Sequence, residues 1–215
     1  LGAKVVTMRG VNKAYDDKVL LSDFDFDMPP GAIVGVTGAN GLGKTTFVNM
    51  IVGREEPDSG TIEIGETTRF CYVDQTRQSL RDELTVYEEV ADGSDVILYG
   101  EKVLSVRHYL ARFLFSGSIQ QTPVGRLSGG ERNRLQLAKF LRHPSNFIIL
   151  DEPTNDLDLM TLRVLEESLT AFPGCAIVIS HDRWFLDRIA THMLAFEGDS
   201  QVRWFEGNFS DYEEW

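Results

Sequence analysis

The sequence of 215 residues is poor in cysteine, poor in basic side chains and free of long apolar runs. Its two cysteines, Cys71 and Cys175, lie far apart, without the close pairs that bind zinc or cross-link a small secreted domain. We therefore expect two buried free thiols in a reducing, cytoplasmic compartment. No apolar run approaches the roughly 20 residues that a membrane-spanning helix needs, so no membrane segment is expected within this sequence.

Basic residues are outnumbered, because 21 Lys and Arg stand against 33 Asp and Glu, which gives a formal net charge of −12. A domain that holds nucleic acid through its own surface usually carries a basic stripe. Any nucleic-acid contact must therefore use a local patch or other parts of a longer protein. The local candidates, which could equally be solvated faces of helices, are Arg107, His108, Arg112, Arg132, Arg134 and Lys139.

Strands and helices alternate along most of the chain. Period-two alternation at residues 4–8 and 23–28 predicts a small antiparallel sheet at the start. Continuous apolar runs at 147–150 and 176–179 are typical of parallel strands covered on both faces. A helical pattern from about 85 to 115, with Val103, Val106, Leu110, Phe113 and Leu114 on one face, predicts a helical insert at about residues 76–127. The sequence thus predicts one α/β domain with a mainly parallel sheet, an N-terminal antiparallel β subdomain and an α-helical insert.

The strongest motif runs from Gly38 to Thr45 and matches G-x-x-x-x-G-K-[ST] between a predicted strand and a predicted helix. Its glycines let backbone N–H groups surround a polyphosphate at a helix N-terminus, Lys44 can reach the phosphates, and the Thr45 hydroxyl can hold Mg²⁺. An ordinary glycine-rich turn is the alternative, but it does not explain Lys and Thr at the required positions. The residues predicted to bind the nucleotide here are Gly38, Asn40, Gly41, Gly43, Lys44, Thr45 and Thr46.

A second element is the apolar run that ends in Asp151 and Glu152. Asp151 follows directly on the strand and is predicted to support the magnesium shell together with Thr45. Glu152 is the better candidate for polarising the attacking water. Such a pair is weak by itself, since many strands end in acidic turns, but it is informative downstream of a P-loop.

A third element is Leu127-Ser128-Gly129-Gly130-Glu131. Ser128 and Glu131 have the spacing of a capping box, which predicts a helix that begins after Ser128. A well-capped helix alone would explain Ser128 and Glu131 but not two glycines, which destabilise a helix that they merely begin. We therefore predict a second helix N-terminus that faces phosphate, with Ser128, Gly129 and Gly130 as its ligands.

Together these motifs resemble the ABC (ATP-binding cassette) superfamily of P-loop NTPases in both order and spacing. The resemblance implies a nucleotide-binding domain that hydrolyses ATP with Mg²⁺. It identifies Gln75 with the glutamine that reaches the metal and the water, and His181 with the histidine at the γ-phosphate. It also identifies Asp158 with the D-loop aspartate and Tyr15 with the aromatic residue that stacks on adenine. The productive site of the family is shared head to tail between two such domains, in one polypeptide or in a homodimer.

A finer resemblance is to the ABC-F family, whose members carry two such domains, have no membrane segments and act on ribosomes. It rests on residues 153–158, 180–187 and 206–212. The commonest pattern of the family has His at the position of Asp156, and an Asp at this position is similar to the C-terminal domains of bacterial members. The chain is accordingly expected to be the second domain of a tandem protein that contacts the ribosome and tRNA through regions outside this sequence. The ATPase subunit of a membrane transporter and a nucleotide-bound scaffold without turnover are the alternatives.

Overall fold

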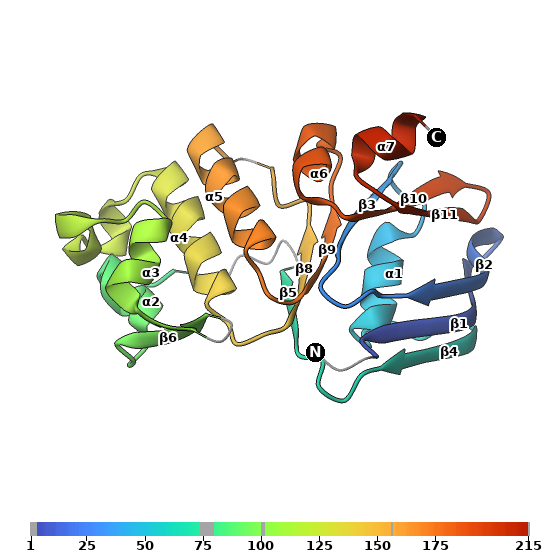
Figure 1. Ribbon diagram of the computed structural model, residues 1–215, viewed down its shortest axis with the longest axis horizontal. Helices are drawn as coiled ribbons and strands as arrows, with labels where there is room; N and C mark the ends of the chain where they lie inside the picture. Colours follow the sequence, from blue (N-terminus) through green and yellow to red (C-terminus); the bar gives the residue numbers. More distant parts are fainter. Residues whose placement is uncertain (1–3, 74–79, 100–101, 156, 215) are drawn as a thin grey trace. The chain divides into compact units, whose positions relative to one another are not determined.

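The computed structural model in Figure 1 describes residues 4–73, 80–99, 102–155 and 157–214. The chain divides into two compact units. The core unit comprises Leu1–Tyr72, Ser145–Thr154 and Pro173–Trp215, and the helical unit comprises Val73–Pro144 and Asn155–Phe172. None of the helices in the described ranges has the length and apolar character that crossing a bilayer requires.

The core unit begins with a three-stranded antiparallel sheet, as predicted. Strand β1 (Val6–Tyr15) lies between β2 (Lys18–Asp27) and β4 (Ser59–Ile64). Val6, Met8 and Val11 of β1 are buried at 0–1% exposure. Alternate side chains therefore enter the core, and the sheet is longer than the predicted runs 4–8 and 23–28.

A mainly parallel sheet follows, with the strand order β11-β10-β3-β9-β8-β5. Strand β9 (Cys175–Ile179) is buried throughout and pairs in parallel with β3 (Ile33–Gly38) and β8 (Phe147–Asp151). These strands confirm the parallel core that the apolar runs predict. Outside the predicted elements lie β10 and β11, of which β10 pairs in parallel with β3 and in antiparallel with β11. The remaining bounds are His192–Gly198 for β10, Gln201–Glu206 for β11 and Phe70–Val73 for β5.

Helix α1 (Lys44–Ile51) is anchored by Phe47, which is fully buried. The Phe47 ring makes edge contacts with Phe26 at 5.4 Å and with Phe196 at 6.0 Å between centroids. Such contacts hold a helix in place at both the antiparallel and the parallel sheet, so the segment between β3 and α1 is held at both ends. The other helices of the core unit are α6 (Arg183–Ile189) and α7 (Phe209–Glu214).

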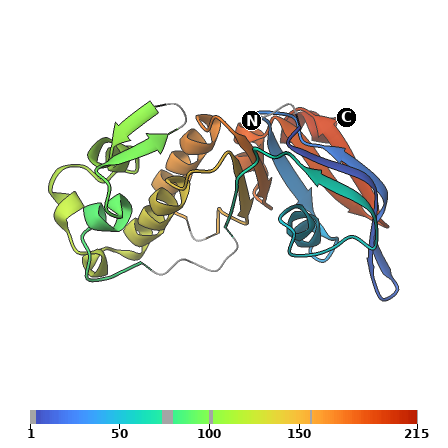
Figure 2. The same cartoon turned by 90° about the horizontal axis from the view of Figure 1, so that it is seen from below.

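The helical unit contains α4 (Gly129–Leu141) and α5 (Leu159–Thr170), which lie side by side in both views (Figures 1 and 2). Helix α4 begins at Gly129, directly after Ser128, as the capping box predicts. Its other elements are α2 (Val86–Ala91), β6 (Val96–Tyr99), β7 (Lys102–Ser105), α3 (Val106–Arg112) and the 3-10 turns Gly117–Gln121 and Val124–Arg126.

The predicted helical run from 85 to 115 is wrong in its middle, where β6 and β7 form a hairpin. Asp92 ends α2 in a left-handed conformation with φ 44°, and the β-branched and aromatic residues that follow favour a strand. Val103 and Leu114, expected on the buried face, are 63% and 40% exposed. Val106, Leu110 and Phe113 are buried as predicted.

Candidate functional site

The loop between β3 and α1 has a conformation that requires glycine at both ends. Gly38 has φ 134°, and a Cβ there would lie 2.4 Å from the carbonyl oxygen of Phe196. Gly43 caps α1 with φ 107°, and a Cβ there would lie 3.1 Å from Leu20. Since L-residues rarely adopt such angles, these glycines let the loop turn tightly at the helix N-terminus, where N–H groups and the helix dipole attract an anion.

Lys44 folds back onto this loop. Its Nζ donates hydrogen bonds to the carbonyl oxygens of Gly38 at 2.6 Å and Ala39 at 2.9 Å, and the residue is 7% exposed. Burial lowers the pKa of Lys44, while the charges of Glu152 and Asp151 oppose that change. The ammonium is therefore held by weak neutral acceptors, which a phosphate oxygen could replace.

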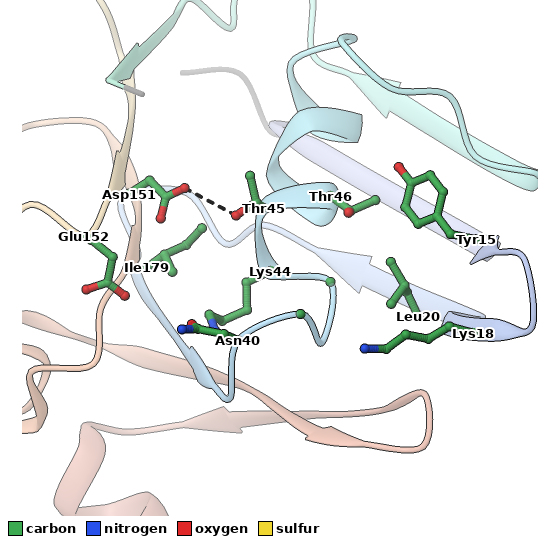
Figure 3. A pocket seen from close by; sticks show the side chains of 12 residues that line it. Tyr15, Lys18, Leu20, Asn40, Lys44, Thr45, Thr46, Asp151, Glu152 and Ile179 are labelled. Carbon is green, nitrogen blue, oxygen red and sulfur yellow. Dashed lines mark hydrogen bonds between the residues drawn. The ribbon is translucent and has the colours of Figure 1, made fainter. Parts of the chain in front are cut away.

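Thr45 and Asp151 meet across the site, as Figure 3 shows. Thr45 Oγ1 donates to Asp151 Oδ2 at 3.4 Å, and Asp151 stands at the carboxyl end of β8. Mg²⁺ is usually held by one or two protein oxygens with phosphate and water completing its octahedron. In the described ranges no group of three or more His, Cys, Asp or Glu side chains could hold a metal. The pair therefore fits a metal that arrives with a polyphosphate, and the third predicted ligand, Gln75, lies outside the described residues.

Glu152 follows Asp151 in a left-handed conformation with φ 49°, fixed by its N–H donating to Ile179 O at 2.9 Å. Its Oε2 accepts from the His181 N–H at 3.4 Å. Its Oε1 is buried, has no hydrogen-bond partner among the described residues and lies 3.4 Å from His181 Nε2. His181 Nε2 is also 3.0 Å from Asn40 Oδ1. A buried carboxylate oxygen without a donor is costly, so a rearrangement that brings a donor to Glu152 Oε1 would be favourable.

Lys44, Thr45, Asp151 and Glu152 line one open cavity of about 330 Å³ in the core unit (Figure 3), whereas His181 and Gly38 do not line it. Tyr15, 46% exposed, lies on the α1 side of the cavity away from Glu152, and its role in stacking on a base stays a prediction. Lys18 and Leu20 also contribute, although no sequence motif marks them. The only sequence feature that could have indicated Lys18 is its position three residues after Tyr15. The lining residues are Tyr15, Lys18, Leu20, Asn40, Gly41, Gly43, Lys44, Thr45, Thr46, Asp151, Glu152 and Ile179.

The predicted capping box at the start of α4 is present. Glu131 Oε2 accepts from the Ser128 N–H at 2.8 Å and from the Ser128 hydroxyl at 2.7 Å. A Cβ on Gly129 would meet nothing within 4 Å, whereas one on Gly130 would lie 2.8 Å from Asp158 Oδ2. Asp158 in turn caps α5 by accepting from the Thr161 N–H at 2.7 Å, and this bond lowers the pKa of its carboxyl group. The helical unit thus places the four predicted residues around one exposed helix N-terminus.

The candidate cations for nucleic acid are largely engaged inside the helical unit. Arg132 pairs with Asp82 at 2.7 Å, and Lys139 pairs with the buried Glu89 at 2.6 Å. The Arg107 guanidinium lies over the Tyr87 ring at 4.9 Å, and that of Arg134 lies over the Phe115 ring at 5.5 Å. His108 Nδ1 is 3.1 Å from Ser105 Oγ, and Arg112 also has a partner. These contacts favour a structural role for the cluster.

Comparison with known families finds a match to the ABC transporter family over residues 21–155. The chain is 54% identical to the energy-dependent translational throttle protein EttA of Haemophilus influenzae over 215 residues, which is 100% of this chain and 39% of that protein. It is 53% identical to EttA of Mycobacterium tuberculosis over 218 residues, again 100% of this chain and 39% of the relative. The chain therefore spans about two fifths of the length of these relatives.

A further relative and a solved structure also match this chain. An uncharacterized ABC transporter ATP-binding protein, YfmR of Bacillus subtilis, is 42% identical over 215 residues, or 100% of this chain and 34% of that protein. Among solved structures, cbiO1 from Clostridium perfringens, part of the ABC transporter complex cbiONQ, has a TM-score of 0.72 and 22% identity. It covers 99% of this chain and 92% of its own chain, and shows that the two share a fold.

Proposed function

Because this chain belongs to the ABC transporter family as an ATPase domain, we propose that it binds Mg-ATP in the cavity of the core unit and hydrolyses it to ADP and phosphate. One observation carries the proposal. Lys44, Thr45, Asp151 and Glu152, which come from the β3–α1 loop and the end of β8, line a single cavity. A nucleotide-bound scaffold without turnover would not need Glu152, Gln75 and His181 together.

Each side chain has a separable role in this proposal. Lys44 and the loop N–H groups neutralise the triphosphate as charge develops on its γ-phosphoryl oxygens. Glu152 Oε1 orients the attacking water and accepts its proton. His181, 3.0 Å from Asn40 Oδ1, would present Nε2 to the γ-phosphate. Thr45 and Asp151 would hold Mg²⁺, which when bound offsets the negative charge of the phosphates.

Glu152→Gln tests this assignment. A general base contributes about 10²–10⁴-fold to rate, so phosphate release should fall by about 100-fold or more while ATP affinity stays unchanged. Glu167→Gln makes the same chemical change at an exposed position on α5 and serves as the matched control. Equal phosphate release from the parent and Glu152→Gln would remove Glu152 from the mechanism.

The active arrangement is proposed to be a head-to-tail pair, in which Ser128–Gly130 of another domain closes over the nucleotide. The open space at Gly129 supports this proposal, since a partner's phosphate could approach there. The other domain would lie in the same polypeptide or in a second copy. The position of this chain as the second domain of a tandem protein stays a prediction. The full reading frame tests it, because a P-loop and a signature motif upstream of this chain would support both the tandem arrangement and the second position.

The whole protein is further proposed to be a cytoplasmic ABC-F factor that acts on the ribosome and tRNA. Relatives at 53% and 54% identity are named as translational throttle proteins, whereas the transporter component at 22% identity shares only the fold. The net charge of −12 opposes contact with RNA, so these contacts are assigned to parts outside this chain.

Full-length Glu152→Gln should co-sediment with ribosomes in Mg-ATP, whereas this chain alone should not. Recovery of the full-length protein with membrane partners and not with ribosomes would favour a transporter role.

A further inference from the structure

Tyr15 is held by a lysine that lies two residues before it on β1. The Lys13 Nζ lies 5.1 Å from the centroid of the Tyr15 ring, within the range of a cation–π interaction. The residue Tyr15 is 46% exposed, so packing alone leaves its side chain room to change rotamer. With an ammonium over one face of the ring, the opposite face is the one left for a planar ligand.

Lys13 is itself fixed by three oxygen atoms. Its Nζ contacts Glu55 Oε1 at 2.6 Å, the Glu56 carbonyl oxygen at 2.8 Å and Asp58 Oδ1 at 3.4 Å. The side chain is 8% exposed, so the cation has little freedom to move. The pKa of the Glu55 carboxyl group is lowered, first by the hydrogen bond from Lys13 and then by one from Tyr15.

The partners of Lys13 come from the segment that follows α1, the helix that begins at the phosphate-binding loop. The N–H groups of Arg54 and Glu55 donate to the Asn49 carbonyl oxygen of α1 at 2.8 Å and 3.2 Å. Asp58 Oδ2 accepts from the Ala14 N–H at 2.7 Å, directly between Lys13 and Tyr15. The end of β1 is therefore tied to the far end of α1, which sets the position of the Tyr15 ring relative to the loop.

We propose that Lys13 is a positioning residue for the nucleobase: it holds the Tyr15 ring at a fixed orientation and distance from the phosphate-binding loop. The inference rests on the proposed function, because it needs a base stacked on Tyr15. Lys13 does not line the cavity, so it acts through Tyr15. Its loss should weaken a ligand that has a base and spare a ligand that has only phosphates.

The test compares displacement of a fluorescent ATP analogue by ATP and by inorganic tripolyphosphate. Lys13→Met removes the charge but keeps an unbranched side chain, and a cation–π contact of this kind predicts about two- to fivefold weaker ATP binding. Binding of tripolyphosphate should not change. Lys13→Arg keeps a cation over the ring and should restore ATP binding. Lys4→Met, which removes a lysine paired with Glu63 on the surface, is the control for the loss of one positive charge.

Lys13→Gln is a second variant that removes the charge but keeps a donor for the Glu56 carbonyl oxygen. It allows the same test if Lys13→Met does not fold. The same ATP-selective loss in both variants supports the proposal. An equal loss for ATP and tripolyphosphate, or no loss for either ligand, overturns it and leaves the proposed function intact. A parent chain that binds the fluorescent nucleotide in neither assay contradicts the proposed function itself.

Discussion

Glu152 in this site has a backbone conformation that non-glycine residues rarely adopt. Glu152 has φ 49°, and a non-glycine residue in such a region costs of order 1–3 kcal/mol. Its N–H bond to Ile179 O and its contacts with His181 maintain that conformation. Strain of this kind persists where the surrounding structure over-determines it, and here it turns a carboxylate into the cavity that Lys44 also lines.

Lys44 predicts a pH dependence of nucleotide binding. Burial lowers its pKa in the free protein, whereas a bound triphosphate would favour the charged form and raise that pKa. Affinity for ATP should therefore fall as the pH rises through the lowered pKa, at a lower pH than for an ordinary lysine. Titrations between neutral and alkaline pH measure this change. Lys44→Ala should bind weakly throughout and lack this pH dependence.

At this scale the sequence was informative only where a motif carried the chemistry. Lys44 and Thr45 could be proposed because their spacing follows from phosphate binding at a helix N-terminus, and Glu152 because it follows an apolar strand downstream of that motif. Tyr15 was predicted by resemblance alone, and Lys18 and Lys13 were not predicted at all. The partners of Lys13 are Glu55 and Asp58, more than 40 residues away, and no local pattern brings such residues together.

At the scale of elements, the phosphate-binding loop depends on close packing between neighbouring strands. Gly38 ends β3 beside Phe196 of β10, its register partner, and a Cβ would lie 2.4 Å from a backbone oxygen. A backbone atom of a paired strand cannot move as a flexible side chain can. Gly38 is therefore required because β10 passes so close to it, and no sequence motif predicts β10.

Gly38→Ala should destabilise the core unit more than a glycine substitution without a clash. Gly31→Ala is the matched control, because Gly31 also has positive φ, 75°, but a Cβ there meets nothing within 4 Å. The control should lose about 1–2 kcal/mol of unfolding free energy, and Gly38→Ala should lose about 1–3 kcal/mol more. Urea unfolding followed by circular dichroism measures both, and equal losses would show that contact with Phe196 is unimportant.

Long periodic elements and capping signals were predictable, whereas short elements next to turns were not. Helix α4 follows from Ser128 and Glu131, whose side chains satisfy the first N–H groups. The β6–β7 hairpin was missed because β7 leads straight into α3, so that Val103 and Val106 have a spacing that also fits a helix. Strand β10 is a short apolar run, and periodicity alone does not separate such a run from a helix.

At the scale of the whole molecule, the chain carries a phosphate-binding loop and a signature helix once each. Under the proposed pairing, each of two domains would contribute one half to each nucleotide site. Gly129 has open space around a Cβ, so its lack of a side chain is not required by its own fold. That observation supports a role toward another molecule.

Glu152→Gln should form a dimer in Mg-ATP, because bound nucleotide is retained and holds the two halves together. Adding Gly129→Asp should abolish association, since a carboxylate at the open position would repel the partner's triphosphate. The same substitution places an acid in the first turn of α4, which favours the helix dipole, so the fold should be kept. Sedimentation velocity with and without Mg-ATP measures the association, and a double variant that still dimerises would contradict the proposed interface.

The most direct measurement is calorimetric titration of the folded chain with Mg-ATP. Lys44 lies on the β3–α1 loop in the cavity that Asp151 and Glu152 also line, and this geometry predicts saturable binding of one nucleotide per chain that Lys44→Ala strongly weakens. Absence of saturable heat from folded protein, or equal binding by Lys44→Ala, would contradict the account.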